Sequence, residues 1–298
     1  MEKIQITVAP HGAELRGLRR GNREYMWNAD KAFWGRVAPI LFPVVGLPAG
    51  ETLRIGGKAF EMHQHGFARD VDFTKVGDAW VYEQKEPREN YPYTFILEAR
   101  YPMTEKSVTC SWTVKNTSAR TMHFSIGAHP AFLMPDYKAD DPVHGYLQCF
   151  DHQGRVVEPT AFSYLEGGLR VPSAPTVVPN ENGLIVLSAD TFKADAFLLE
   201  RSIVASVALL DKEKKEVLRV NCPQAEAYGL WAPYKPGCPF VCIEPWCGIA
   251  DRKGFTGDIS ERDCNHSLAP GESYEFAYEI ELPKLGLSVE FTYLCRCG

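Results

Sequence analysis

Short stretches rich in β-branched and aromatic residues recur along this chain, separated by glycine, proline, asparagine and aspartate. Several stretches alternate apolar and polar side chains, as half-buried antiparallel strands do, whereas the spacing of an amphipathic helix is nearly absent. The pattern therefore predicts an all-β protein. The clearest predicted strands are Ala79–Gln84, Thr94–Tyr101, Val108–Lys115, Ala205–Leu210, Val217–Val220 and Tyr274–Leu282.

Turn residues indicate how these strands are connected. Gly56-Gly57 and Pro270-Gly271-Glu272 are typical turn sequences, and residues 212–216 are expected to form a hairpin loop. Residues 136–179 contain many prolines and glycines, and we interpret them as a loop-like excursion. Long loops in a compact β domain often shape the mouth of a binding site.

No spacer rich in proline, serine or glycine and no long charge run divides the 298 residues. All-β chains often form one domain even when they are long. We therefore predict a single antiparallel β-sandwich domain over residues 1–298, with a core at about 12–282 and a C-terminal extension at 283–298.

The composition excludes several classes of partner. With 45% hydrophobic and 23% charged residues the chain is typical of soluble globular proteins, and its net charge is −6. Its scattered basic residues do not form the patch that nucleic-acid binding requires. No apolar run is long enough to span a bilayer, and the first residues do not resemble a signal peptide, so we expect a cytoplasmic protein.

The nine cysteines include no CxxC pair. Cys238, Cys242 and Cys247 are close in sequence, but strand-like apolar residues surround them. We interpret them as buried reduced thiols, with a structural zinc site as the alternative.

Four segments place polar residues inside apolar surroundings, where a polar group needs a partner or a function. Arg36 interrupts the apolar segment at 34–46, and Glu244 does the same at 240–248. Each has a structural interpretation as half of an ion pair and a functional one as a wall of a pocket. Trp246, two residues after Glu244, could provide a platform for a sugar ring or simply pack in the core.

The segment HQHGFARD at 63–70 has two interpretations. His63 and His65 would point the same way on a strand, as a metal-binding pair does. Alternatively, Gly66 allows a turn that presents His65 alone at the mouth of a pocket, with Arg69 nearby. We expect no metal site here, because no third ligand can be named.

Two further polar residues are candidates. His129 lies within FSIGAHPAF, and Pro130 after it stops regular ladder bonding, which suits a strand that ends at a site. Asp195 stands alone between apolar residues, and a turn carboxylate is its simplest interpretation. The chain has no P-loop, dinucleotide-binding turn, GxSxG elbow or HExxH motif.

Taken in order along the chain, several short motifs resemble the aldose 1-epimerase (galactose mutarotase-like) family, in particular its LacX-like bacterial branch. The resemblance extends from about Gly12 to Leu282. The motifs are GAEL, EYMW, WGRVAPILFPVVG, HGFAR, GAHPAF and IEPWCG.

The resemblance implies a large antiparallel supersandwich and a cofactor-independent isomerase that interconverts the α and β anomers of an aldohexose. By motif, Glu244 falls on the family's general base, His129 on its general acid and His65 on a sugar-binding histidine. Asp195 falls on the substrate-binding aspartate through a short local pattern only.

One departure concerns an Asn-Arg pair of the galactose-type enzymes. The corresponding positions here are Pro39 and Ile40, and this chain therefore lacks that arginine. We expect Arg36 or Arg69 to replace its contact with the sugar, and the loss argues against assuming galactose as the substrate.

Two alternatives to a free-sugar epimerase stay open. A hexose-6-phosphate 1-epimerase would need a basic cluster at the pocket mouth. A non-catalytic carbohydrate-binding protein on the same fold would not need the acid and base pair. In each case the expected partner is a small sugar, and the chain is expected to be a monomer or homodimer.

Overall fold

The computed structural model describes residues 2–283 of the chain. Nearly all of its regular structure is strand, as the sequence pattern predicts, and the fold is an antiparallel β-sandwich. The only helical elements among the described residues are three single 3₁₀ turns, η1 (Ala49–Glu51), η2 (Ala68–Asp70) and η3 (Ile259–Glu261). No helix in this part of the chain is long and apolar enough to cross a membrane. The predicted extension lies outside the described residues from 284 onwards.

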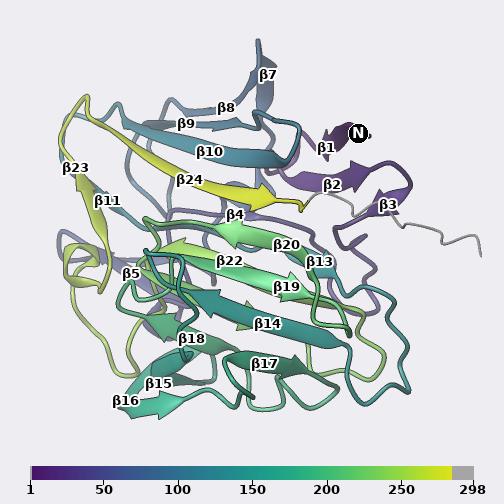
Figure 1. The fold of residues 1–298 in the computed structure, drawn as a ribbon. Helices are drawn as coiled ribbons and strands as arrows, with labels where there is room; N and C mark the ends of the chain where they lie inside the picture. The colour runs from purple at the N-terminus through teal and green to yellow at the C-terminus, as the bar shows by residue number, and fades with distance from the viewer. Residues whose placement is uncertain (1, 284–298) are drawn as a thin grey trace, which may run out of the picture.

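The larger sheet has nine strands, each antiparallel to its neighbours, and runs across the front of the molecule in Figure 1. From edge to edge its strands are β17 (Leu184–Leu187), β14 (Gly145–Phe150), β19 (Ser206–Leu210), β20 (Glu216–Asn221), β24 (Ser273–Glu281), β10 (Ser107–Asn116), β9 (Phe95–Arg100), β8 (Ala79–Gln84) and β7 (Thr74–Val76).

The second sheet has six strands and provides the frame of the site described below. Its order is β18 (Phe197–Glu200), β21 (Ala227–Trp231), β22 (Phe240–Cys247), β12 (Ile126–Ala128) and β4 (Ile40–Leu41), with β13 (Ala131–Leu133) also paired to β22. Every residue of β22 is buried, because neighbours cover it on both edges and both faces.

Smaller sheets complete the fold. They are β1 (Ile4–Val8) with β2 (Leu15–Arg20) and β3 (Arg23–Glu24), β5 (Thr52–Ile55) with β6 (Lys58–Glu61), β11 (Met122–Phe124) with β23 (His266–Leu268), and β15 (Thr160–Glu166) with β16 (Leu169–Val177).

The core lies between the two large sheets and is rich in aromatic side chains. Trp112 of β10 stacks on Phe276 of β24 with ring centroids 5.2 Å apart, and both are buried. Ile243 of β22 belongs to the same hydrophobic cluster. The Tyr228 hydroxyl of β21 donates a hydrogen bond of 3.0 Å to the Ala205 carbonyl next to β19, so a buried polar group is satisfied where the sheets meet.

The predicted strands are confirmed to within one residue at either end, and the hairpin loop between β19 and β20 is present. The interpretation of residues 136–179 as loop-like is wrong, because this segment contains β14, β15 and β16. Gly167 and Gly168, with φ of 59° and 81°, form the tight turn of the β15–β16 hairpin, which their lack of a Cβ permits. The many prolines and glycines of this segment lie mainly at the ends of its strands, and their number led us to interpret the whole segment as a loop.

Candidate active site

A pocket of about 430 Å³ brings together six of the seven residues that the sequence singled out for the site. They come from widely separated parts of the chain, and only the fold places them around one cavity. The six are His65, Arg69, His129, Asp195, Glu244 and Trp246.

Strand β22 presents Glu244 and Trp246 on the same face because side chains two residues apart on a strand point the same way. Glycines on both neighbouring strands make room for them. A Cβ at Gly229 of β21 would lie 2.8 Å from the Trp246 ring, and one at Gly127 of β12 would lie 2.7 Å from it. The Trp246 indole is only 5% exposed and donates to the Ala128 carbonyl at 3.2 Å, so packing already holds it firmly.

His129 lies directly opposite Glu244, in a gap of the sheet. Along β22, Gly127 pairs with Trp246 and Ala131 pairs with Cys242, so the continued register sets residue 129 against residue 244. Pro130 and Pro245 lie at this gap, and neither has an N–H to continue the ladder. The two prolines therefore interrupt strand pairing at the point where the acid and base candidates face each other.

The two side chains are in contact and almost completely buried. His129 Nε2 lies 3.2 Å from Glu244 Oε2, and the residues are 7% and 2% exposed. The pKa of His129 is lowered to about 3, mainly by burial and then by the charges of Arg69 and Arg36. The pKa of Glu244 is raised well above its usual value, mainly by burial and then by the charge of Asp195. A neutral imidazole facing a protonated carboxyl is therefore favoured over the charged pair that a basic Glu244 and an acidic His129 imply. Either form holds one shared proton.

His65 enters the pocket from a turn in which it has a φ of 66° and Gly66 has a φ of 68°. Only glycine fits at the second position, because a Cβ there would overlap the Phe42 carbonyl. The Nδ1 atom of His65 accepts a hydrogen bond of 3.1 Å from the Gly46 N–H. Burial lowers its pKa well below the usual value, so the ring is neutral and its one proton must be on Nε2. His65 is thus a fixed hydrogen-bond donor.

The two candidate arginines have different positions. Arg69 lines the pocket, and its Nε has no hydrogen-bond partner among the described residues. Arg36 is not among the lining residues; it binds Asp70 at 2.8 Å and the Arg69 carbonyl at 3.3 Å, and so holds the turn that carries Arg69. Of these two arginines, Arg69 therefore reaches the pocket and Arg36 supports it from outside. The side chain of Ile40 is buried in the core and does not line the pocket.

Asp195 reaches the pocket from the turn before β18 and has a φ of 94°, which is rare outside glycine. Its Oδ1 accepts from the N–H of Ala196 at 2.8 Å, which fixes the side chain in the turn. A carboxylate there adds a hydrogen-bond acceptor to the pocket.

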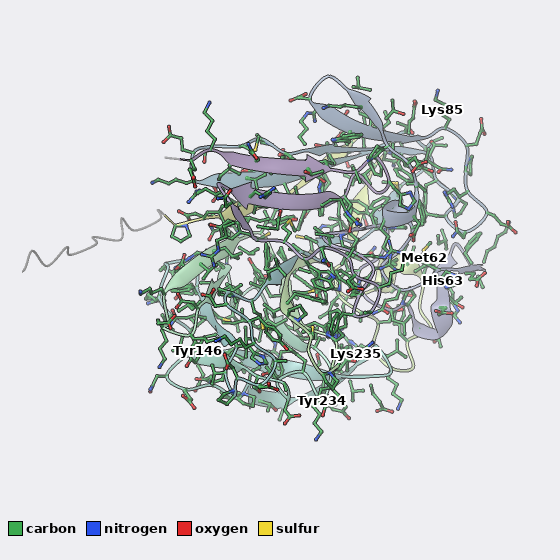
Figure 2. All side chains as sticks on the ribbon, turned by 90° about the vertical axis from the view of Figure 1, so that its right-hand side faces the viewer. Met62, His63, Lys85, Tyr146, Tyr234 and Lys235 are labelled. Atoms are coloured by element: carbon green, nitrogen blue, oxygen red, sulfur yellow. The ribbon has the colours of Figure 1, made fainter. Side chains whose placement is uncertain are left out.

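His63 does not share the environment of His65. It is exposed on the outside of the molecule (Figure 2), with Glu51 at 3.5 Å and Glu61 at 3.8 Å. Among residues 2–283 two groups of side chains are arranged closely enough to hold a metal ion, and neither contains His63 or His65. The turn at His65 separates the two histidines that a regular strand would have placed together.

Sequence reasoning missed the aromatic wall of the pocket. Trp34 stacks on the His129 imidazole with centroids 4.6 Å apart, and Trp231 meets the same ring edge-on at 5.7 Å. Trp34 begins the WGRVAPILFPVVG segment, so its motif gave a signal that our reasoning did not use. Trp231 carried none beyond strand composition. Leu165 and Gly168 from the β15–β16 hairpin also line the pocket.

The arrangement combines one buried acid and base pair with donors at His65 and Arg69, an acceptor at Asp195 and tryptophan walls. Such a site suits a neutral, oxygen-rich ring that undergoes proton transfer. The model of the aldose 1-epimerase family matches residues 1–281.

Relatives cover nearly the whole chain. This chain is 29% identical over 294 residues to the chromosomal protein LacX of Lactococcus lactis subsp. lactis. The alignment covers 94% of this chain and 97% of LacX. Two solved structures align at a TM-score of 0.84 and 29% identity. One is a galactose mutarotase related enzyme from Lactobacillus acidophilus, over 95% of each chain, and the other is a galactose mutarotase-like protein from Lactobacillus casei, over 94% of this chain and 97% of that one. The resemblance seen in the motifs is confirmed, and this chain belongs to the aldose 1-epimerase family.

Proposed function

We propose that this protein catalyses the interconversion of the α and β anomers of a free aldohexose. The observation that carries the proposal is the 3.2 Å contact between His129 Nε2 and Glu244 Oε2 at the wall of the pocket. The ring oxygen and the anomeric hydroxyl of a sugar are bonded to the same carbon. An acid and a base that serve both must therefore lie side by side, as these two do.

The pair can open and close the ring without changing its total number of protons. The base takes the proton of the anomeric hydroxyl while the acid delivers its own proton to the ring oxygen. The bond between C1 and the ring oxygen breaks, and the free aldehyde forms. After rotation about the C1–C2 bond, closure on the other face reverses both transfers and yields the opposite anomer.

Burial supports this chemistry. In the family's assignment Glu244 is the base and His129 the acid, and that state is reached from the neutral pair by moving one proton across their contact. Adding a proton to this neutral pair, or removing the proton that the two residues share, leaves a net charge on two almost completely buried side chains, which is costly. Positioned acid and base groups each contribute about 10²–10⁴-fold to such proton transfers. Neither step requires a metal ion or an organic cofactor.

The charges that line the pocket favour a free sugar over a sugar phosphate. Arg69 is the one basic side chain among the lining residues other than histidine, and Asp195 adds an acidic side chain. A dianionic phosphate is normally held by several cationic or N–H donors. The nearby Arg36 is already paired with Asp70.

Anomer exchange measured by NMR or polarimetry on glucose, galactose and glucose 6-phosphate tests the proposal. We expect rates above the spontaneous background on at least one free hexose and a lower kcat/KM on the phosphate ester. A strong preference for glucose 6-phosphate would favour the hexose-6-phosphate alternative. Sugar binding without acceleration of exchange on any of these sugars would identify a carbohydrate-binding protein instead.

A further inference from the structure

We propose that Glu226, Cys247 and His266 form a binding site for a divalent transition-metal ion of the zinc type, separate from the sugar pocket. One carboxylate oxygen, the thiol sulfur and one imidazole nitrogen of these residues all lie within 4.8 Å of one another. They come from three segments, so the tertiary structure alone brings them together.

The sheet register explains how two of the three meet. Ala227 of β21 pairs with Trp246 of β22, so the continued register places Glu226 opposite Cys247. Side chains of directly opposed residues lie on the same face of a sheet. Because side chains alternate along β22, that face is opposite to the one that presents Glu244 and Trp246 to the sugar pocket. Neither Glu226 nor Cys247 lines that pocket.

His266 is supplied by β23, which pairs with β11 outside the six-stranded sheet. Its ring packs against Tyr274 with centroids 4.5 Å apart and against Phe124 at 5.8 Å. These two aromatic contacts fix the direction in which the imidazole points. A preset ring orientation lowers the entropy that a metal ion must overcome when it binds.

Two of the three donor atoms have no hydrogen-bond partner in the described part of the chain. Glu226 Oε2 and His266 Nε2 are buried atoms without a hydrogen-bond partner among residues 2–283, although they lie 3.5 Å from each other. Cys247 is 1% exposed, and its thiol donates a hydrogen bond of 3.2 Å to the Gln224 carbonyl, which a metal ion would replace when the thiol loses its proton. Buried polar atoms are usually satisfied, and two adjacent exceptions beside a thiol indicate a missing shared partner.

Ligand type and spacing identify the class of ion. A tetrahedral zinc site with bonds of about 2.0–2.3 Å separates its ligand atoms by roughly 3.3–3.8 Å. The observed distance of 3.5 Å between the Glu226 and His266 donors fits this spacing. Sulfur, nitrogen and oxygen together suit zinc or cobalt(II) rather than calcium or magnesium, which prefer oxygen alone. With three protein ligands, the fourth position would hold water or an anion.

Titration of the purified, tag-free full-length protein with Co²⁺ under reducing conditions tests the proposal, since cobalt reports thiolate coordination by a charge-transfer absorption. We expect one Co²⁺ per chain, with this absorption, displaced by Zn²⁺. Cys247→Ser should abolish the absorption, and Glu226→Gln or His266→Gln should weaken binding by about tenfold or more. Cys238→Ser is the matched control, because this buried thiol contacts the Phe240 carbonyl away from the cluster and should leave binding unchanged.

Two results would overturn the proposal. One is the absence of saturable binding with thiolate absorption in the wild type. The other is binding that survives Cys247→Ser but is lost in Cys242→Ser, which would place the metal beside His129 and Glu244 instead. If Cys247→Ser does not fold, the partly exposed positions Glu226 and His266 still decide the matter, because unchanged affinity in both of their variants refutes the site. These readouts are independent of whether the protein accelerates anomer exchange.

Discussion

Replacing Glu244 by glutamine should separate catalysis from stability. The amide has nearly the same shape and can still donate to His129 across the 3.2 Å contact, but it cannot take up or release the shared proton. Glu244 is only 2% exposed, and no other carboxylate of the described residues contacts His129 to act in its place. We therefore expect kcat to fall by about 10²–10⁴-fold, which corresponds to about 2.7–5.5 kcal/mol in the activation barrier.

The same change should not destabilise the fold. A carboxyl whose pKa is raised by burial costs folding free energy once the pH exceeds its pKa in the unfolded chain, because folding then requires uptake of a proton or burial of a charge. Each pKa unit of such a shift corresponds to about 1.4 kcal/mol. Glutamine has no charge to desolvate, so at pH 7 we expect an unchanged or higher Tm.

NMR exchange rates and thermal unfolding followed by circular dichroism provide the two readouts. Glu24→Gln is the matched control, because one carboxylate oxygen of Glu24 accepts from the N–H groups of Leu18, Tyr25 and Met26, and an amide oxygen can do the same. It should leave both readouts close to wild type. A loss of less than tenfold in Glu244→Gln would refute its role in proton transfer. A rate loss accompanied by a large drop in Tm would indicate misfolding instead.

Three further outcomes are expected. Because burial lowers the pKa of His129 to about 3, the imidazole stays neutral down to about pH 4. The kcat measured by polarimetry should therefore change less than about twofold between pH 7 and 5. A fall in kcat centred near the usual histidine pKa of about 6.5 would contradict the burial argument. Gly66→Ala should lower the free energy of unfolding in urea by more than Gly77→Ala. Both positions have a positive φ, which costs an alanine about 1–2 kcal/mol, but only at Gly66 would the added Cβ also overlap neighbouring backbone. Equal losses in the two variants would refute the overlap. Arg69→Gln should reduce kcat/KM by about 10–100-fold through a lost charged hydrogen bond, and Arg36→Gln by less; the reverse order would show that Arg36 is the arginine that contacts the sugar.

Local sequence pattern was sufficient to predict the fold class. Alternating strands such as Ala79–Gln84 and Val108–Lys115 keep their structure because the period of two is a property of the strand itself, and both appear as β8 and β10. Pattern also picked out His129 and Glu244, since a polar residue inside an apolar strand needs a partner. That each was the other's partner required the register of β22, which no local pattern contains.

What the tertiary structure alone decided were distances and directions between remote residues. A single turn with positive φ at His65 and Gly66 places one histidine in the pocket and leaves His63 exposed. Likewise the pairing of Arg36 with Asp70 directs Arg69, rather than Arg36, to the pocket.

The cluster at Glu226, Cys247 and His266 shows the same limit most clearly. The cysteine was conspicuous in the sequence as a neighbour of Cys238 and Cys242, yet in the fold it meets a glutamate 21 positions before it and a histidine 19 positions after it. The spacing of residues along one strand shows which of them share a face, but it does not show which residues of other strands lie beside them. The alternation of side chains along a strand is a local property that a sequence reveals. The pairing of strands is a global outcome of packing, and it determined which side chains meet in the candidate sites.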